Sequence, residues 1–301
     1  MIRLPRIVLV LLAAGLASGW PVAQAATNAR GFASPDDAVT ALMGAVKADD
    51  RKALLAILGP ESRPLVYSGD AVGDRAARAR FAAEYDAGHH MTGGGGKMVL
   101  YVGPDDFPFP IPLVPDGPVW RFDTRAGANE ILNRRIGRNE ISAIQACLAY
   151  VDAQRDYYSE DRNANGLREY AQRFVSSPGR RDGLFWPTKP GETSSPLGPL
   201  MAQARAEGYE STRTPYFGYF YRILTAQGAD APKGAFDYRA HGHMIGGFAL
   251  VAFPAQYGVS GVMTFIVSHD GIVYQKNLGP DTAGIARKMT LFNPDPSWQK
   301  V

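Results

Sequence analysis

Apolar residues recur at helical spacing in short segments near the beginning of the chain. In SPDDAVTALMGAVKADDRKALLAILGP they follow one helical face over positions 39–46 and again over 54–58. Ser34 before a proline has the character of a helix N-cap, and Gly59 before a proline ends the second segment. The pattern therefore predicts two short helices, followed by a third over residues 74–86.

The pattern then changes to short apolar runs separated by glycine and proline. The four glycines at 93–96 are expected to interrupt the chain, and KMVLYVG, PIPLV and VWRFD are predicted to be β-strands. Prolines at 108, 110 and 112 cannot donate ladder hydrogen bonds, which places them at a sheet edge or outside the sheet. Helices followed by a small antiparallel sheet resemble a short version of the nuclear-transport-factor-2-like cone fold.

From Asn129 onward, the sequence ILNRRIGRNEISAIQACLAYVDAQRDYYSEDR predicts one long amphipathic helix. Its apolar stripe is expected to contain Ile141, Ile144, Leu148 and Val151, which repeat at intervals of three and four. The helix leads into DRNANG, where asparagine and glycine favour a stop.

The second half of the chain is predicted to be mainly β. After a proline-rich stretch and a short helix over 200–207, the segments GYFYRILT, FALVAF, GVMTFIV and GIVYQK have the apolar character of strands. Asp270-Gly271 between the last two predicts a hairpin. We therefore expect an α+β protein of two packed modules, residues 26–128 and residues 129–301, with the long helix packed on the second antiparallel sheet.

The first residues, MIRLPRIVLVLLAAGLASGWPVAQA, have the pattern of a secretory signal peptide over 1–25. Two arginines precede an apolar run, and Ala23-Gln24-Ala25 fits the small-residue rule for cleavage. An uncleaved membrane anchor is the alternative, but the apolar run is short for a bilayer span. We expect a periplasmic or secreted protein with no membrane span once the signal peptide is removed.

Net charge and cysteine content limit the classes of partner and the thiol chemistry expected of the exported chain. Loss of Arg3 and Arg6 lowers the formal net charge from +3 to +1, and no concentrated basic segment follows, so nucleic acid is not an expected partner. Cys147 is the only cysteine, which excludes a disulfide within one chain. Its apolar helical context favours a buried structural residue over a nucleophile.

Several stretches spread over most of the chain carry a family resemblance. They are FPFPIPLV, WRFDTRAG, EILNRRIGRNE, YVDAQRDYY, YAQRFVSSPGRRDGLFWP, SPLGPL, GYFYRILTAQG, MIGGFALVAFPAQYGVSGVMTFIVSHDGIVYQKNLGPDT and FNPDPSW. These stretches are similar to a bacterial exported family known as a domain of unknown function, number twenty-nine-fifty. The resemblance implies no particular activity, because the family has no assigned one.

Residues 129–276 have a second, remoter resemblance. A long helix with NEISAIQ and AQRDYY, a loop with DRNANG and a sheet ending in TFIVSHDGIVY are similar to the heads of type II secretion pseudopilins. That likeness implies a helix packed on an antiparallel sheet, with loops that bind calcium in some members. The hydrophobic helix start that assembles pseudopilin filaments is absent here, since Asn133, Arg134 and Arg135 precede Ile136.

Asp161, Asn163 and Asn165 alternate in DRNANG, as in the first half of a calcium-binding loop. Counted from Asp161, position 9 is Glu169, whereas position 12 is Gln172, which cannot replace a bidentate carboxylate. The same segment suits a turn that ends a helix, because asparagine and glycine accept left-handed backbone. We favour the turn and keep the two carboxylates and two asparagines as candidates for weak calcium binding, with no other cofactor expected.

Recognisable catalytic motifs are missing from the sequence. His241 and His243 alternate in RAHGHMIGG but lack a third ligand at a recognisable spacing. No serine lies in a nucleophile elbow, and no phosphate loop or dinucleotide fingerprint is present. We therefore expect a non-catalytic protein. The alternative is a periplasmic metal-dependent hydrolase that uses Asp161, Glu169 and the histidines.

Aromatic and basic residues gather in GRRDGLFWP and YFGYFYRI. Aromatic side chains beside arginine are typical of binding hot spots, so these segments are the candidate binding groove. Its candidate members are Arg180, Arg181, Phe185, Trp186, Tyr216 and Tyr219. A small sheet also needs large aromatic side chains to close its core against a long loop, and we favour this structural role over the groove. The expected role is binding or scaffolding in the cell envelope, with a protein, a peptide or a glycan as partner.

Overall fold

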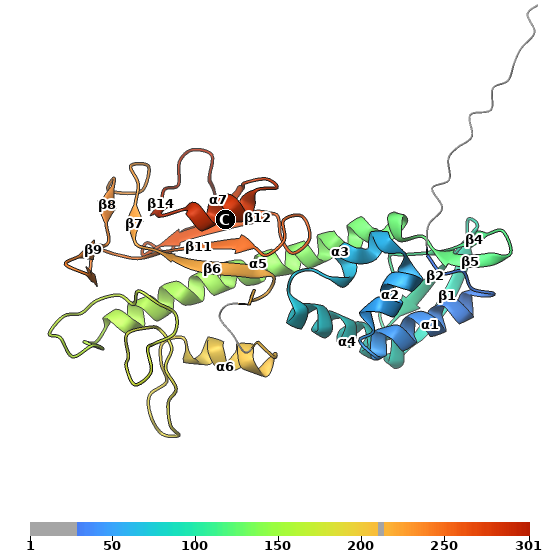
Figure 1. The fold of residues 1–301 in the computed structure, drawn as a ribbon, viewed down its shortest axis with the longest axis horizontal. Coiled ribbons are helices and arrows are strands. Elements are labelled where there is room, and N and C mark those ends of the chain that lie inside the picture. Colours follow the sequence, from blue (N-terminus) through green and yellow to red (C-terminus); the bar gives the residue numbers. More distant parts are fainter. Residues whose placement is uncertain (1–28, 210–213) are drawn as a thin grey trace, which may run out of the picture.

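The structure of the protein, a computed structural model, describes residues 29–209 and 214–301. The expected signal peptide at 1–25 lies outside these described residues. Figure 1 shows two modules arranged along one long helix, α5 (Thr124–Tyr158). Helices and antiparallel sheets occur in both modules, which confirms the expected α+β class.

The first module packs its helices on one small antiparallel sheet. The helices are α1 (Pro35–Lys47), α2 (Arg51–Leu58), the 3-10 helix η1 (Pro60–Ser62), α3 (Arg63–Val66) and α4 (Ala71–Ala87). The strands are β1 (His89–Gly94), β2 (Lys97–Val102), β3 (Phe107–Pro108), β4 (Leu113–Asp116) and β5 (Val119–Phe122). Their spatial order is β1-β2-β4-β5, with β3 paired to β2. Buried apolar side chains from helices and sheet form one core here.

The glycine-rich segment after α4 is more regular than expected. Gly93 and Gly94 belong to β1, where they pair with Met98 and Lys97 of β2. The expected interruption at 93–96 is therefore wrong for the first two glycines, because a β-ladder needs only backbone N–H and carbonyl groups.

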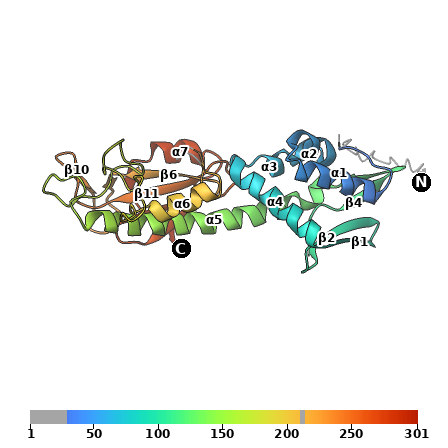
Figure 2. The ribbon, with the colours of Figure 1, turned by 90° about the horizontal axis from the view of Figure 1, so that it is seen from below.

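The second module is built on a five-stranded antiparallel sheet. Its order is β15 (Gln299–Lys300), β13 (Val273–Asn277), β12 (Met263–Ser268), β11 (Ala249–Pro254) and β6 (Tyr219–Leu224). Helix α5 covers one face of the sheet and α7 (Thr282–Lys288) the other, as Figure 2 shows. The interior strand β11 is consequently buried along its whole length. The predicted hairpin between β12 and β13 is confirmed.

Short elements complete the margin of the second module. They are α6 (Gly198–Ala206), β7 (Ala226–Gln227), β8 (Phe236–Asp237), β9 (Arg239–Ala240), β10 (His243–Met244) and β14 (Leu291–Phe292). The strands β7, β8 and β14 form a small separate sheet, and β9 pairs with β10.

Helix α5 belongs to both modules. It begins at Thr124 rather than at Asn129, because the side chain of Asp123 accepts a hydrogen bond from the backbone N–H of Ala126 and caps the helix. The expected module boundary at 128/129 therefore falls inside the helix. Over the described residues, no helix is both long enough and apolar enough to cross a membrane.

The buried face of α5 differs from the expected stripe. Ile141 and Leu148 are 63% and 37% exposed, whereas Ala143 and Cys147 have no exposed surface. Small side chains on the sheet-facing side let a helix approach a sheet closely, and this packing decides which face is buried. The expectation for Ile141 and Leu148 is wrong for this reason, and that for Val151 is confirmed.

Candidate functional site

Some candidate residues from either side of Phe174 meet in one polar cleft: Asn163, Asn165 and Glu169 before it, and Arg180 and Arg181 after it. This cleft lies beyond the C-terminal end of α5 and has a volume of about 700 Å³. Its polar lining residues include Arg162, Asn163, Asn165, Glu169, Arg173, Arg180, Arg181, Asp182 and His243. We refer to it as the polar cleft.

Asp161 organises the turn that leads from α5 into the polar cleft. Its carboxylate accepts hydrogen bonds from the backbone N–H groups of Gly166 and Asn165, at 2.8 and 3.2 Å. These bonds, that from Gly166 first, hold the pKa of Asp161 below its ordinary value. Gly166 has a φ of +81°, the left-handed backbone that glycine adopts readily. The turn favoured by the sequence is therefore present.

Glu169 lies at the base of the polar cleft, and its side chain is only 7% exposed. Its Oε1 accepts hydrogen bonds from the Nδ2 groups of Asn163 and Asn165, at 2.8 and 2.9 Å. Its Oε2 lies 3.0 Å from Nδ1 of His243. Burial acts to raise the pKa of Glu169, but these hydrogen bonds outweigh it and bring the pKa below its ordinary value. The buried carboxylate is therefore ionised at neutral pH.

The four calcium candidates are brought together, but they bond mainly to protein groups. Asn163 and Asn165 donate to Glu169, and Asp161 accepts from the backbone. In the ranges that the structure describes, no three His, Cys, Asp or Glu side chains are grouped so as to hold a metal ion. Weak calcium binding at this loop stays a prediction.

His243 contacts Glu169, and the sequence grouped Glu169 with the histidines only in the hydrolase alternative, without singling out His243. The two residues are 74 positions apart, and no motif spans them. His241, by contrast, lies in the turn between β9 and β10 with a φ of +50°. The turn therefore separates the two histidines, which do not share a strand.

Two arginines without acidic partners give the polar cleft an excess of positive charge. Arg180 and Arg181 line it and are exposed. Neither makes an ion pair with any residue described by the structure, and Arg181 lies 5.4 Å from the centre of the Trp186 ring. The other charged side chains have partners, in the pairs Arg162–Asp156, Arg162–Glu160, Arg173–Asp182 and His243–Glu169.

The aromatic candidates do not form an exposed groove. Phe185, Trp186 and Tyr219 are buried members of the second core. The structural role that we favoured for the aromatics is therefore confirmed for these three, because the sheet needs large side chains to close its core against the long loop. Trp186 also supports the cleft, since the guanidinium groups of Arg162 and Arg181 both lie over its ring.

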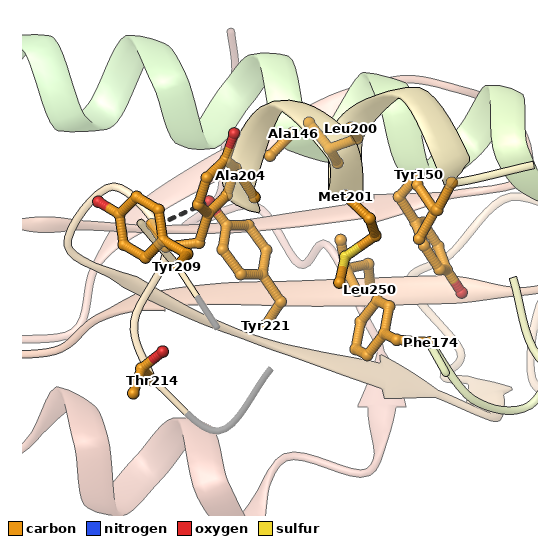
Figure 3. A pocket seen from close by; sticks show the side chains of 12 residues that line it. Ala146, Tyr150, Phe174, Leu200, Met201, Ala204, Tyr209, Thr214, Tyr221 and Leu250 are labelled. Carbon is orange, nitrogen blue, oxygen red and sulfur yellow. Dashed lines mark hydrogen bonds between the residues drawn. The ribbon is translucent and has the colours of Figure 1, made fainter. Parts of the chain in front are cut away.

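Tyr216, the remaining candidate, lines a separate apolar pocket of about 100 Å³. Figure 3 shows this pocket beneath α6, with Met201 pointing toward Leu250 and Phe174. The side chains of α5 and α6 that line it are apolar or aromatic, so it continues the core. The sequence-predicted binding residues are thus divided between the polar cleft, the core and this pocket.

Comparison with known proteins gives the family of the chain. A comparison with curated proteins and one with solved structures found no match, so the likeness to pseudopilins is not confirmed. A family model described as "Protein of unknown function (DUF2950)" matches residues 29–301. Because this match covers most of the chain and agrees with the resemblance seen in the sequence, the protein belongs to the DUF2950 family.

Proposed function

We propose that the protein is an exported, non-catalytic binding protein of the cell envelope whose polar cleft takes an acidic segment of a partner protein or peptide. The observation that carries this proposal is the pair Arg180 and Arg181, two exposed guanidinium groups without carboxylate partners among the described residues. Guanidinium groups bind carboxylates through paired hydrogen bonds, and such charge-assisted bonds are stronger than neutral ones.

The surroundings of the arginines support a rigid site. Arg181 is held against Trp186, and the backbone carbonyl of Arg181 accepts a hydrogen bond from the Tyr157 hydroxyl at 2.7 Å. Asp182 accepts from the backbone N–H and the hydroxyl of Ser177. The loop that carries the arginines is therefore fixed before a ligand arrives, which lowers the entropy lost on binding.

Export is the part of the proposal that rests on the N-terminal sequence. The charged start, the apolar run and the Ala23-Gln24-Ala25 site place the mature N-terminus near Ala26. Intact mass of the periplasmic fraction tests this, and a protein that retains Met1 there would contradict it.

Titration calorimetry with a hexaglutamate peptide tests the binding site. We expect the exported chain to bind hexaglutamate and not hexaglutamine, and Arg180→Gln/Arg181→Gln to weaken binding by about tenfold or more. Lys189→Gln is the matched control, because Lys189 is an exposed cation on the same long loop outside the cleft. Unchanged affinity of the double variant overturns the proposal. Arginine-dependent binding of oligogalacturonate instead of hexaglutamate identifies a glycan as partner.

A metal-dependent hydrolase is the second candidate, favoured by the contact between Glu169 and His243. A carboxylate that orients an imidazole through Nδ1 leaves Nε2 for a metal or for proton transfer. Metal analysis of protein purified without chelator separates the two candidates. Stoichiometric zinc or another transition metal supports the hydrolase, and metal-free protein that binds hexaglutamate supports the binding role.

A further inference from the structure

A second cleft lies where the two modules meet. It has a volume of about 360 Å³ and lies between α4, the middle of α5 and the turn that precedes β6. Glu207 and Tyr209, which follow the C-terminal end of α6, line it as well, and its lining residues include Arg80, Arg138, Ser142, Glu207, Tyr209 and Phe217. We refer to it as the junction cleft, and no residue of it belongs to the polar cleft.

Asp70 fixes the geometry of the junction cleft. Its buried carboxylate caps α4 by accepting a hydrogen bond from the N–H of Gly73 at 2.9 Å. The same carboxylate accepts from the Tyr209 hydroxyl and from the N–H of Gly218 in the second module, both at 2.8 Å. The walls of the cleft are therefore held by one shared acceptor, and the cleft is formed without a ligand.

Arg80 on α4 and Arg138 on α5 bring two positive charges to the junction cleft. Arg135 beside them is already engaged, with Asp74 at 4.0 Å and with two carbonyl groups of α3. Arg80 and Arg138 have no carboxylate partner in the portion of the chain that the structure describes. Burial lowers the pKa of Arg138, and the nearby Arg80 lowers it further. An anion bound between the two guanidinium groups would relieve this repulsion.

Phe217 forms the aromatic wall of the same cleft. Its φ is +49°, a backbone conformation that bulky residues rarely adopt. The hydrogen bond from Gly218 to Asp70 holds the turn in this conformation. The Phe217 ring lies 4.2 Å from the Tyr216 ring, centre to centre, and 6.2 Å from the Tyr209 ring. Strained backbone that holds an aromatic ring in the wall of a cleft, as Phe217 does in the junction cleft, is typical of binding sites.

We propose that the junction cleft binds a small acidic sugar, a ring that carries a carboxylate and hydroxyl groups, as in a uronic acid. Arg80 and Arg138 take the carboxylate, and Phe217 covers the apolar face of the ring. The Ser142 hydroxyl and the Glu207 carboxylate, which line the cleft, provide partners for the sugar hydroxyls. This site is separate from the polar cleft and does not depend on the function proposed for it.

Calorimetric titration of the full exported chain with glucuronate tests this site. We expect binding that Arg80→Gln and Arg138→Gln each weaken by about tenfold. Phe217→Gly removes the ring and at the same time relieves the strained backbone, so it should weaken binding while the melting temperature is maintained or raised. Arg180→Gln, in the polar cleft, is the control and should bind glucuronate as the unmodified protein does.

The outcomes that overturn the inference are equally specific. Failure to bind glucuronate, or unchanged binding by folded Arg80→Gln and Arg138→Gln variants, removes the site. Glucose that binds as tightly as glucuronate removes the role of the carboxylate. If acetate binds as tightly as glucuronate and Phe217→Gly has no effect, the cleft does not recognise the sugar ring. The proposal that hexaglutamate binds through Arg180 and Arg181 is tested separately and is not affected by these results.

Discussion

Cys147 lies on the sheet-facing side of α5 and has no exposed surface. Burial raises the pKa of its thiol to about 12, so the reactive thiolate is scarce at neutral pH. We expect a thiol reagent to label the protein only after unfolding, and Cys147→Ser to lower the free energy of unfolding by about 1 kcal/mol or more. Timed labelling followed by mass spectrometry measures the first effect. Rapid labelling of the native protein would contradict the structural role of Cys147.

Glu169 makes the stability of the second module depend on pH. Its pKa in the folded protein lies below the ordinary value of 4.5. A carboxyl group of this kind stabilises the fold above its unfolded pKa, and that stabilisation is lost as the pH falls through the folded value. We expect the free energy of unfolding to fall below about pH 4.5, and to fall less steeply in Glu169→Gln.

Urea unfolding at a series of pH values checks the effect of Glu169. The exposed Glu192, which lies outside the polar cleft, provides the control variant Glu192→Gln. Its pH dependence should match that of the unmodified protein. Identical pH dependence in Glu169→Gln and the unmodified protein would show that the hydrogen bonds to Glu169 do not stabilise its charge.

At the residue scale, local spacing was enough to predict part of the polar cleft. The turn from Asp161 to Gly166 follows from asparagine and glycine over a few residues, and the basic pair Arg180 and Arg181 is adjacent in the chain. Which histidine contacts Glu169 could not be predicted, because the contact with His243 depends on how the β9–β10 hairpin folds back over the loop.

Helix α5 contains two glycines in contrasting surroundings. A Cβ atom at Gly127 would lie 2.2 Å from the backbone oxygen of Pro110, whereas one at Gly137 would meet nothing within 4 Å. We expect Gly127→Ala to lower the free energy of unfolding by about 1–3 kcal/mol. Gly137→Ala should raise it by about 0.5–1 kcal/mol, because alanine favours a helix interior. Urea unfolding of both variants provides the measurement, and changes of the same sign would contradict the packing described for α5.

At the element scale, the main strands and the existence of α5 follow from the pattern of apolar residues. Six of the seven segments predicted as strands correspond to β2, β5, β6, β11, β12 and β13, and the seventh, PIPLV, overlaps β4 only at Leu113 and Val114. The start of α5 and its buried face could not be predicted from that pattern. Asp123 caps the helix and so extends it, and small residues decide which side of the helix meets the sheet. Both effects depend on tertiary contacts rather than on periodicity.

Asp70 connects the two modules and should decide whether they unfold together. Asp70→Ala leaves the Tyr209 hydroxyl and the Gly218 N–H without their buried acceptor. We expect a loss of at least about 2 kcal/mol in the free energy of unfolding and a thermal transition that broadens or divides into two. Differential scanning calorimetry checks both effects.

The control for Asp70 is another helix cap. Asp50 caps α2 through the backbone N–H groups of Lys52 and Ala53, within the first module alone. Asp50→Ala should lower the free energy of unfolding by about 1 kcal/mol and leave the shape of the thermal transition unchanged. If the thermal transition of Asp70→Ala has the same shape as that of the unmodified protein, Asp70 does not couple the two modules.

At the scale of the whole molecule, two modules with separate cores are predictable from the alternation of helical and strand patterns. Their relative placement is not, because it depends on contacts such as that between Asp70 and Gly218, which are 148 positions apart. Each module contributes one core, and the shared helix α5 places the polar cleft at its far end and the junction cleft near its middle.

The central claim is that the polar cleft binds an acidic segment through Arg180 and Arg181, and hydrogen exchange in the presence of hexaglutamate tests it most directly. Amides of residues 161–173 and 177–183 line or support this cleft and should exchange more slowly when the peptide is bound. The β1–β2 hairpin of the first module should exchange at an unchanged rate, and Arg180→Gln/Arg181→Gln should abolish the protection. Protection confined to the first module, or protection that persists in the double variant, would contradict the claim.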